Sequence, residues 1–401
     1  MTTTLRSWTI DTLAGSGEPG HAGDGGPADR ACLHEPKGLA LDSRGNVFIA
    51  DSENHVIRKI DRVTGVISTV AGASAGQSVR SGVEPDAEAR YTIEEDPFAE
   101  TSETVTQKYT QQADLSGTVR YLINGATSPK RFGGDGGPAI HAQLNFPTAV
   151  AVSHDGTILV ADTMNHRVRR VDAQTGVITT LAGTGQARFS GDGGPAHQAA
   201  LNEPAALALD GQGRLFIADQ TNHRVRVVDL GTGLISTVAG TGSATYDGDG
   251  IPATAASLAG PSGLVVRDGV LYIADTFNGR IRAVDLLTGV ISTMAGDGGA
   301  YRYQSSDEPP SSSLSRPSGI AIDSYGSLFV TDSDSHLVRC WNHDTKMIAR
   351  IAGSGAASFS GDGGTALEAS LSYPFGIIAD QDGALLVADT FNHRIRRLSL
   401  K

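Results

Sequence analysis

The sequence predicts an all-β fold, a six-bladed β-propeller in which a single domain spans residues 1–401. Three observations predict it: a repeat of about 57 residues, four short strand patterns in each copy, and a copy that is split between the two ends of the chain. The repeat is marked by an apolar run that ends on an aspartate, as in FIAD and LVAD. These aspartates are 56 or 57 residues apart, except that 111 residues separate the first two: Asp51, Asp162, Asp219, Asp275, Asp332 and Asp389.

The third copy, residues 201–240, illustrates the four strands of a blade. The first apolar run, ALALD, ends at a DGQG turn, and RLFIAD follows as the second strand. The third strand is HRVRVVD, in which valines alternate with arginines, and LISTVAG is the fourth. Short β-rich runs bounded by Gly and Asp turns are typical of consecutive antiparallel strands. No part of the repeat has helical spacing.

The two ends of the chain hold complementary parts of one copy. Residues 7–15, SWTIDTLAG, resemble a fourth strand without the preceding three, whereas the last copy ends after its third strand, HRIRRLSL. We therefore expect residues 7–15 to pair beside residues 393–399 and close the ring, which removes exposed edge strands. A linear solenoid is the alternative, but it needs atypical capping copies at its ends.

A short motif, Asn-His in most copies, stands at the start of each third strand. The matching pairs are Asn54-His55, Asn165-His166, Asn222-His223, Asn278-Gly279, Ser335-His336 and Asn392-His393. On these residues the chain resembles the NHL-repeat family, named after an Asn-His-Leu triad at this place. The resemblance covers nearly everything except the insertion and implies a six-bladed propeller of the NHL type. It is much less specific for function, because the family includes binding modules and a few enzymes.

Composition narrows the classes of partner. With 44 acidic and 32 basic residues the net charge is −12, so we expect neither a nucleic-acid nor a membrane partner, since both need a positive field. No apolar stretch is long enough for a transmembrane helix, and the first residues lack the apolar core of a signal peptide. Two cysteines, Cys32 and Cys340, form neither a disulfide framework nor a zinc cluster. We therefore expect a cytoplasmic protein without a metal or other cofactor; the oligomeric state stays open.

Features that all six copies share are expected to serve the blade. Each strand-ending aspartate is followed seven residues later by an arginine: Arg58, Arg169, Arg226, Arg282, Arg339 and Arg396. A carboxylate and a guanidinium that flank a tight turn can join two strands by charge-assisted hydrogen bonds. The five motif histidines are expected to be structural too, each packing in or bonding to its own turn. Equivalent positions in different blades are too far apart to share a zinc ion.

A glycine-rich loop, GDGGPA or a close variant, recurs in five copies. Such loops can hold calcium or resemble phosphate cradles. These lack the Lys-Ser/Thr and following helix of a Walker loop and the carboxylates of an EF-hand. The DGDG sequence at residues 247–250 comes closest to a calcium loop. We favour a turn in which glycines adopt left-handed angles and the aspartate bonds its own backbone.

The candidate site is expected where the copies differ. In propellers, the loop that enters the first strand and the loop after the second strand face one mouth of the central channel. One variable row flanks a repeated proline: Glu35-Pro36-Lys37, Phe146-Pro147-Thr148, Glu203-Pro204-Ala205, Gly260-Pro261-Ser262, Arg316-Pro317-Ser318 and Tyr373-Pro374-Phe375. The other row precedes the motif Asn or its substitute: Glu53, Met164, Thr221, Phe277, Asp334 and Phe391. From these rows we predict a pocket whose ligand-binding residues are Lys37, Glu53, Arg316, Asp334, Tyr373 and Phe375.

Two further breaks in the repeat are expected on the same face. An insertion over residues 73–130 joins the fourth strand of one blade to the first strand of the next. Its first half is acidic, and its second half predicts two strands around a DLSG turn. The fifth copy replaces its glycine-rich loop with residues 301–313. We expect the insertion to rise over the mouth as a lid or partner arm, with a mobile passenger as the alternative.

Two functions compete. The favoured one is binding of a small-molecule or protein ligand at the channel mouth beneath the insertion. The alternative is a stand-alone propeller enzyme, a lyase, hydrolase or ring-forming synthase, so catalysis is left open. In that case Glu35 or Glu203 would be the general acid or base, and Lys37 or Arg316 would bind an anionic group. The family's metal-dependent lyases use channel histidines, and none of the six first strands carries one.

Overall fold

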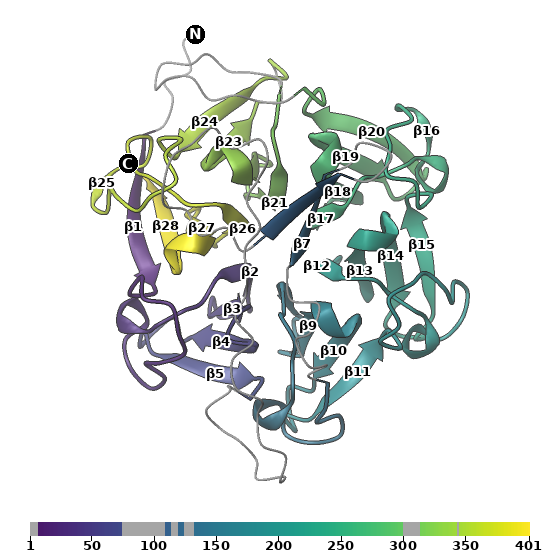
Figure 1. The fold of residues 1–401 in the computed structure, drawn as a ribbon, viewed down its shortest axis with the longest axis horizontal. Helices are drawn as coiled ribbons and strands as arrows, with labels where there is room; N and C mark the ends of the chain where they lie inside the picture. Colours follow the sequence, from purple (N-terminus) through teal and green to yellow (C-terminus); the bar gives the residue numbers. More distant parts are fainter. Residues whose placement is uncertain (1–6, 74–108, 114–118, 124–131, 300–312, 343–344) are drawn as a thin grey trace.

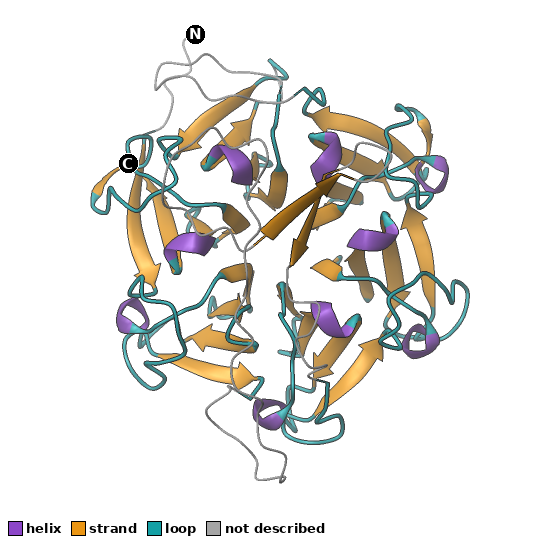
Figure 2. Ribbon diagram, viewed as in Figure 1, coloured by secondary structure: helices purple, strands orange, loops and turns teal. Residues whose placement is uncertain are grey.

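The computed structural model describes residues 7–73, 109–113, 119–123, 132–299, 313–342 and 345–401. Within them, six antiparallel sheets stand around a central axis (Figure 1). Almost all regular structure is strand, and short 3₁₀ turns make up the rest (Figure 2). The predicted six-bladed, all-β propeller is therefore confirmed.

Each of the first three blades has four strands that follow one another outward from the axis. Their bounds are β2 (Pro36–Leu41), β3 (Val47–Asp51), β4 (Val56–Ile60) and β5 (Ile67–Ala71); β8 (Ala149–Val152), β9 (Ile158–Asp162), β10 (Arg167–Val171) and β11 (Ile178–Ala182); and β12 (Pro204–Leu209), β13 (Arg214–Asp219), β14 (Arg224–Asp229) and β15 (Ile235–Ala239).

The other three blades repeat this order, and two of them carry a fifth, two-residue strand at the outer edge. Their bounds are β17 (Pro261–Arg267), β18 (Val270–Asp275), β19 (Arg280–Asp285), β20 (Val290–Ala295) and β16 (Ile251–Pro252); β21 (Pro317–Ile322), β22 (Leu328–Asp332), β23 (Leu337–Trp341) and β24 (Ile348–Ala352); and β26 (Pro374–Ala379), β27 (Leu385–Asp389), β28 (Arg394–Leu400), β1 (Trp8–Ala14) and β25 (Gly364–Thr365).

Short 3₁₀ helices mark two turns of the repeat. One set follows the glycine-rich loops: η1 (Ala28–Arg30), η2 (Ala139–His141), η4 (Ala196–Gln198) and η6 (Ala253–Ala255). The other set follows the second strands: η3 (Thr163–Asn165), η5 (Gln220–Asn222), η7 (Thr276–Asn278), η8 (Ser333–Ser335) and η9 (Thr390–Asn392). In the described part of the chain, no helix has the length and apolar character needed to cross a membrane.

The last blade closes the ring with strands from both ends of the chain. β1 pairs antiparallel with β28, with Thr9 opposite Ser399 and Asp11 opposite Arg397. Trp8 and Ile10 of β1 are buried in the core that this blade shares with blade 5. The predicted pairing of residues 7–15 with residues 393–399 is confirmed.

The hydrophobic core lies between neighbouring blades. The second strands are mostly apolar up to their final aspartate, and every residue of VFIAD in β3 is buried, because both faces of the strand are covered. One buried cluster joins Phe48 and Ile57 of blade 1 with Val160 and Ile178 of blade 2. Each blade therefore holds its neighbours in place, and the first strands are left facing the axis.

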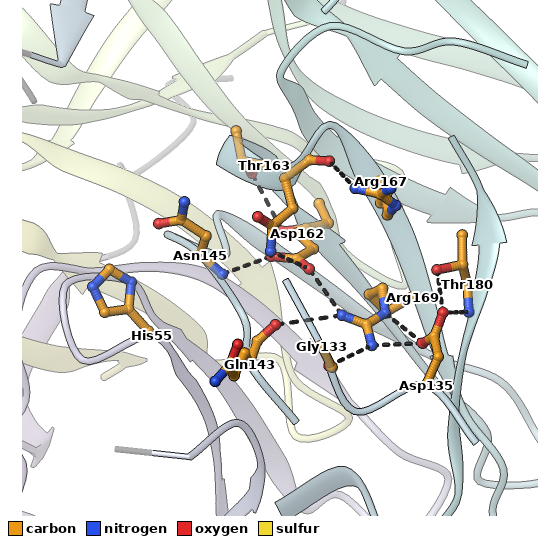
Figure 3. Close-up of polar contacts among 12 residues, drawn as sticks. His55, Gly133, Asp135, Gln143, Asn145, Asp162, Thr163, Arg167, Arg169 and Thr180 are labelled. Atoms are coloured by element: carbon orange, nitrogen blue, oxygen red, sulfur yellow. Dashed lines mark hydrogen bonds and ion pairs between the residues drawn. The ribbon is translucent and has the colours of Figure 1, made fainter. Parts of the chain in front are cut away.

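A buried arginine ties the strands of every blade, as Figure 3 shows for Arg169. Its guanidinium lies 3.1 Å from Asp162 at the end of β9, and neither side chain has any exposed surface. The corresponding pairs in the other blades lie 3.1 to 3.5 Å apart. The predicted Asp–Arg pairing is confirmed. Burial raises the pKa of Asp162 to about 6, so this carboxylate is charged at neutral pH.

The glycine-rich loops are turns, but their aspartate has a different role from the predicted one. Gly134 and Gly136 have φ of 86° and 81°, the left-handed angles that were expected. Asp135, however, accepts from Arg169 at 2.6 Å and from the backbone N–H of Thr180 at 3.1 Å. The predicted bond to its own backbone is thus replaced by contacts across the blade. A fully buried arginine gains a second carboxylate in this way, which offsets the cost of its burial.

The insertion contains the two predicted strands. β6 (Tyr109–Ala113) and β7 (Val119–Ile123) pair antiparallel, and Figure 1 draws this hairpin in front of the centre of the ring. The acidic first half, the DLSG turn and residues 301–312 of the fifth copy lie outside the described residues. The expectations for those segments therefore stay predictions.

Candidate functional site

A cavity of about 1150 Å³ occupies the centre of the ring. The first strands of all six blades line it, together with the loops that enter them and the turns after the second strands. Its inner wall is mainly Ala, Val, Leu, Ile and Gly, whereas charged and aromatic side chains gather where the first strands begin. An apolar cavity with a few polar groups at its opening is the usual form of a small-molecule site.

Backbone strain marks the residues at this opening. The residue before the repeated proline has a left-handed φ in five blades: 51° at Glu35 and Phe146, 54° at Glu203, 46° at Tyr373 and 57° at Gly260. Only Gly260 adopts this region without a steric penalty. For the other four the cost is of order 1–3 kcal/mol each, so the surrounding structure must hold them there.

The motif histidines hold these five residues. The backbone N–H of each donates a hydrogen bond to Nδ1 of the histidine in the preceding blade. The pairs are Phe146 with His55 (3.0 Å), Glu203 with His166 (3.2 Å), Gly260 with His223 (3.1 Å), Tyr373 with His336 (3.2 Å) and Glu35 with His393 (3.2 Å). The histidines are structural, as expected, but they join neighbouring blades and do not merely bond to their own turns.

Because Nδ1 accepts in these bonds, the ring proton of each neutral histidine resides on Nε2. His336 also packs edge-on against Tyr373, with 4.5 Å between ring centroids. Burial lowers the pKa of His336 to about 4, although nearby Asp334 acts in the opposite direction. His336 is therefore neutral under physiological conditions, and its Nδ1 can accept the hydrogen bond from the backbone N–H of Tyr373.

Arg316 departs from the pattern, and the sequence contains the reason. Blade 4 has Gly279 in place of the motif histidine, so no imidazole reaches the backbone of Arg316. Arg316 keeps a negative φ, and its N–H donates to Asp332 Oδ1 of its own blade at 2.8 Å. Its guanidinium lies 3.5 Å from Asp334, and its Cζ is 5.6 Å from the ring centroid of Phe277.

Lys37 lies between aromatic rings of the two neighbouring blades. Its Nζ is 4.3 Å from the ring centroid of Phe375 and 5.1 Å from that of Phe146, and the residue is only 7% exposed. Blade 6 separates blade 1 from blade 5, because β26 contacts both β2 and β21. We call Lys37, Arg316, Tyr373 and Phe375 the cationic arc, since they form a continuous stretch of the mouth over blades 5, 6 and 1.

The two glutamates lie in different surroundings. Glu203 belongs to blade 3, across the ring from blade 6 (Figure 1). Its Oε2 accepts a 2.6 Å hydrogen bond from Thr221, a residue of the second variable row. Glu35 precedes Pro36 in blade 1 and is only 1% exposed. The mouth thus has one carboxylate in blade 3, bound to Thr221 of the same blade, and another in the same blade as Lys37.

Six of the eight predicted site residues line the cavity: Glu35, Lys37, Glu203, Arg316, Tyr373 and Phe375. The other two, Glu53 and Asp334, are not among its lining residues. Asp334 still reaches the mouth through its ion pair with Arg316. The backbone N–H of Glu53 donates to the carbonyl of His34 at 3.1 Å, which fixes its turn beside the opening.

Several lining residues were not among the eight predicted ones: Thr148, which belongs to the first variable row, and Gln220, His223 and His393, which belong to neither row. Gln220 could have been found, because the equivalent residue is Ser or Thr in every other copy. Two of those hydroxyls show what the position normally does: Thr163 and Thr390 each donate to a proline carbonyl of the next blade at 2.8 Å. The two histidines could not have been found, since they belong to a motif shared by most copies.

The described residues contain no group of three or more His, Cys, Asp or Glu side chains that could hold a metal ion.

Comparison with protein-family models gives two matches. A model of the Teneurin NHL domain matches residues 12–94, and the NHL repeat model matches residues 144–171 and 314–341. The second set of matches falls on the first three strands of blades 2 and 5. These are the segments that contain the aspartate, the motif and the buried arginine.

Known proteins share the repeat at moderate identity. NHL repeat-containing protein 2 of Bos taurus is 26% identical over 346 residues, which cover 83% of this chain and 42% of that protein. Protein SUPPRESSOR OF QUENCHING 1, chloroplastic, of Arabidopsis thaliana is 28% identical over 296 residues, or 70% of this chain and 27% of that protein. The chain thus spans less than half the length of these relatives.

Among solved structures, a structural genomics protein of unknown function from Bacteroides thetaiotaomicron has a TM-score of 0.62. The match covers 99% of this chain and 76% of that one at 16% sequence identity. At this identity the likeness concerns the fold alone.

Proposed function

This chain belongs to the NHL-repeat family of six-bladed β-propellers, and we propose that its function is to bind a small organic ligand in the central cavity. One observation carries the proposal: a cavity of about 1150 Å³ opens at a mouth to which different blades contribute different chemical groups. That size slightly exceeds the roughly 300–1,000 Å³ of typical small-molecule sites.

The side chains at the mouth are not explained by the needs of the blade. The blade repeats its aspartate, arginine and proline in every copy, whereas Lys37 and Arg316 each occur once at their positions and glutamate occurs twice, as Glu35 and Glu203. Lys37 and Arg316 are only 7% and 8% exposed, and burying a cation is costly. These two cations lower the stability of the fold, and the other blades have no cation at the same positions. Recognition of a ligand is the best explanation for them.

A small molecule fits this site better than a protein ligand does. The cavity is enclosed by the first strands of six blades, and the mouth residues point their aromatic rings toward one another, as Tyr373 and Phe391 do at 4.9 Å. A protein partner needs an interface of roughly 800 Å² on each side, which the interior of a ring does not offer. A protein ligand would have to bind the outer rim.

The test is to block the cavity from inside. Ala205 lines the cavity at the position that holds Lys37 in blade 1 and Phe375 in blade 6, so Ala205→Trp adds a large side chain where large side chains are tolerated. Parent and variant are screened by thermal shift against organic acids, amines, sugars and aromatic compounds. We expect at least one class to raise the Tm of the parent and to leave that of Ala205→Trp unchanged.

Gln212→Trp is the matched control, because Gln212 lies exposed in the turn before β13, away from the cavity. It should respond to compounds as the parent does. If no compound distinguishes the parent from Ala205→Trp, the cavity is not a binding site and the proposal fails.

A second candidate function is turnover of the bound molecule by acid–base chemistry. It is favoured by Glu35 and Glu203, which stand at the mouth on strained backbone, a combination common at active sites. Compounds that bind are incubated with the protein and followed by proton NMR. Product formation that Glu203→Gln or Glu35→Gln abolishes, with binding retained, would make the protein an enzyme; unchanged compounds would leave it a binding protein.

A further inference from the structure

We propose that the ligand of the central cavity is an organic anion with an aromatic or similarly flat apolar body. This inference rests on the proposed function and names the chemical class that the cavity takes. It is carried by the cationic arc, by the aromatic rings packed against its two cations, and by the position of Glu203 across the ring.

The two cations are local additions to the blade pattern. At the position of Lys37 the other blades have Thr148, Ala205, Ser262, Ser318 and Phe375, and at the position of Arg316 no other blade has a cation. The chain as a whole carries a net charge of −12. Lys37 and Arg316 line the cavity together with Glu35 and Glu203, so an anion is favoured beside the two cations and not throughout the cavity.

The backbone around Arg316 is also specialised. The replacement of histidine by Gly279 frees Arg316 from the left-handed conformation that the equivalent residues adopt. A guanidinium has five N–H donors, so Arg316 can keep its contact with Asp334 and hold a second anion in addition. The Arg316–Asp334 distance of 3.5 Å and the 33% exposure of the Asp334 side chain are typical of a weak ion pair.

Aromatic rings accompany both cations. Lys37 Nζ lies 4.3 Å from the centroid of Phe375 and 5.1 Å from that of Phe146, and the guanidinium of Arg316 lies 5.6 Å from that of Phe277. These cation–π contacts fix the cations beside apolar surface. A ligand whose charge meets Lys37 or Arg316 therefore has its body against rings and against the apolar first strands.

Glu203 disfavours the opposite orientation. Its carboxylate lies in blade 3, across the cavity from blade 6, and is held by Thr221 at 2.6 Å. A carboxylate repels an anion, so the charged end of the ligand belongs on the side of blades 5, 6 and 1. Glu35 is a second carboxylate at the mouth, in blade 1 with Lys37, so of the two cations it is Arg316 in blade 5 that lies two blades away from either glutamate.

Two probes of the same shape separate charge from apolar contact. One is 1-anilinonaphthalene-8-sulfonate, an aromatic anion, and the other is N-phenyl-1-naphthylamine, which lacks the sulfonate; both fluoresce when they enter an apolar site. We expect the parent to bind the sulfonate more tightly than the amine. Lys37→Met and Arg316→Gln should each weaken sulfonate binding by roughly tenfold or more, the loss typical of one charge-assisted contact. Both variants should leave binding of the neutral probe unchanged.

Matched controls are available outside the cavity. Lys59 Nζ also lies over an aromatic ring, 5.7 Å from the centroid of Phe48, and neither residue lines the cavity. Lys59→Met therefore controls for Lys37→Met, and the exposed Arg44 gives Arg44→Gln as the control for Arg316→Gln. Both controls lower the net charge by the same amount and should bind the sulfonate as the parent does.

The outcomes are distinguishable from those of the proposed function. If the two probes bind equally and Ala205→Trp removes both, the cavity binds ligands but the anion inference is wrong. If Ala205→Trp leaves sulfonate binding intact, the probe lies elsewhere and the proposed cavity site fails with it. Absence of sulfonate binding to the parent, or equal losses in the control variants, also overturns the inference.

Discussion

At the scale of single residues, the fold depends on charges that are buried in pairs. Each blade has an arginine with almost no exposed surface that contacts the aspartate ending the second strand, and in five blades a glycine-rich loop supplies a second aspartate. A buried pair of this kind adds little net stability over an apolar pair, but removal of one partner leaves an uncompensated charge. The arginine is therefore expected to contribute more to selecting this arrangement of strands than to the free energy of unfolding.

We expect Arg169→Met to destabilise the protein by about 3–5 kcal/mol, because the fully buried Asp162 would lose its ion-pair partner. Arg170→Met is the control in the same strand: its side chain is 47% exposed and lies 3.9 Å from Asp172, so the change should be within about 0.5 kcal/mol. Denaturant unfolding followed by circular dichroism measures both. Equal effects of the two substitutions would contradict a structural role for the buried pair.

The motif histidines act at the same scale, and His336 makes their role testable by pH. Its folded pKa is about 4, whereas an unfolded histidine titrates near 6.5. Between these values only the unfolded chain gains a proton at this position. The stability that His336 contributes is therefore complete above pH 6.5 and is lost as the pH falls toward 4.

His336→Asn removes this titration while keeping a residue that tolerates left-handed backbone. The variant should be less stable than the parent at pH 7.5, and the difference should shrink by about 1–2 kcal/mol at pH 5. Taking the difference between two proteins cancels the titration of the groups that both retain. A gap that is constant or wider at pH 5 would contradict the neutral, accepting imidazole.

At the scale of elements, the insertion lies in the connection between β5 of blade 1 and β8 of blade 2. The start of this connection resembles that of the equivalent connections between other blades. After β5, the N–H groups of Gly72 and Ala73 donate to the carbonyls of Ala139 and Ala142 in the next blade. The uninterrupted connection after β11 uses the same first bond, from Gly183 to Ala196. The bond from Gly72 thus lies outside the insertion, and only the bond from Ala73 comes from the insertion, at its first residue.

Replacing residues 73–130 with a copy of residues 184–190 should therefore preserve the fold. Loop length changes closure entropy by only about 0.6 kcal/mol per doubling, and none of the six blades uses a strand from the insertion. Far-ultraviolet circular dichroism and the unfolding midpoint should match those of the parent. Loss of the folded state would show that the insertion belongs to the core.

At the scale of the whole molecule, the ring is closed by the pairing of β1 with β28. β1 supplies the outer strand of the last blade, and it buries Trp8, Ile10 and Ala14. Without it β28 would become an exposed edge whose unpaired N–H and C=O groups can recruit other chains. The two ends of the chain are thus part of one sheet.

Deletion of residues 1–15 should lower the Tm by several degrees or cause aggregation, because the edge of β28 and its apolar neighbours become exposed. Deletion of residues 1–6 alone keeps β1 and serves as the control. Differential scanning calorimetry and size-exclusion chromatography measure the two effects. An unchanged Tm in the longer deletion would refute closure through β1.

Much of this molecule was predictable from local patterns. The four strands of each blade, the ring closure and the Asp–Arg pairs follow from residues that are close in sequence or that recur at a fixed period. Six of the eight predicted site residues line the cavity. They could be predicted because the fold of the blade does not require a particular residue at the positions where the copies differ. The pairing of β1 with β28 was also predictable, because the last copy lacks a fourth strand and residues 7–15 resemble one.

Contacts between blades were decided by the tertiary structure alone. The histidine bonds join residues that are 37 to 358 positions apart, and their geometry depends on the angle at which neighbouring blades meet. That angle puts Glu35, Glu203 and Tyr373 into left-handed backbone and brings Lys37 between two rings of adjacent blades. The repeat pattern predicts the features that are common to all blades and lie within one blade. It does not predict contacts between neighbouring blades. Only the closed ring brings the unshared residues together around the mouth of one cavity.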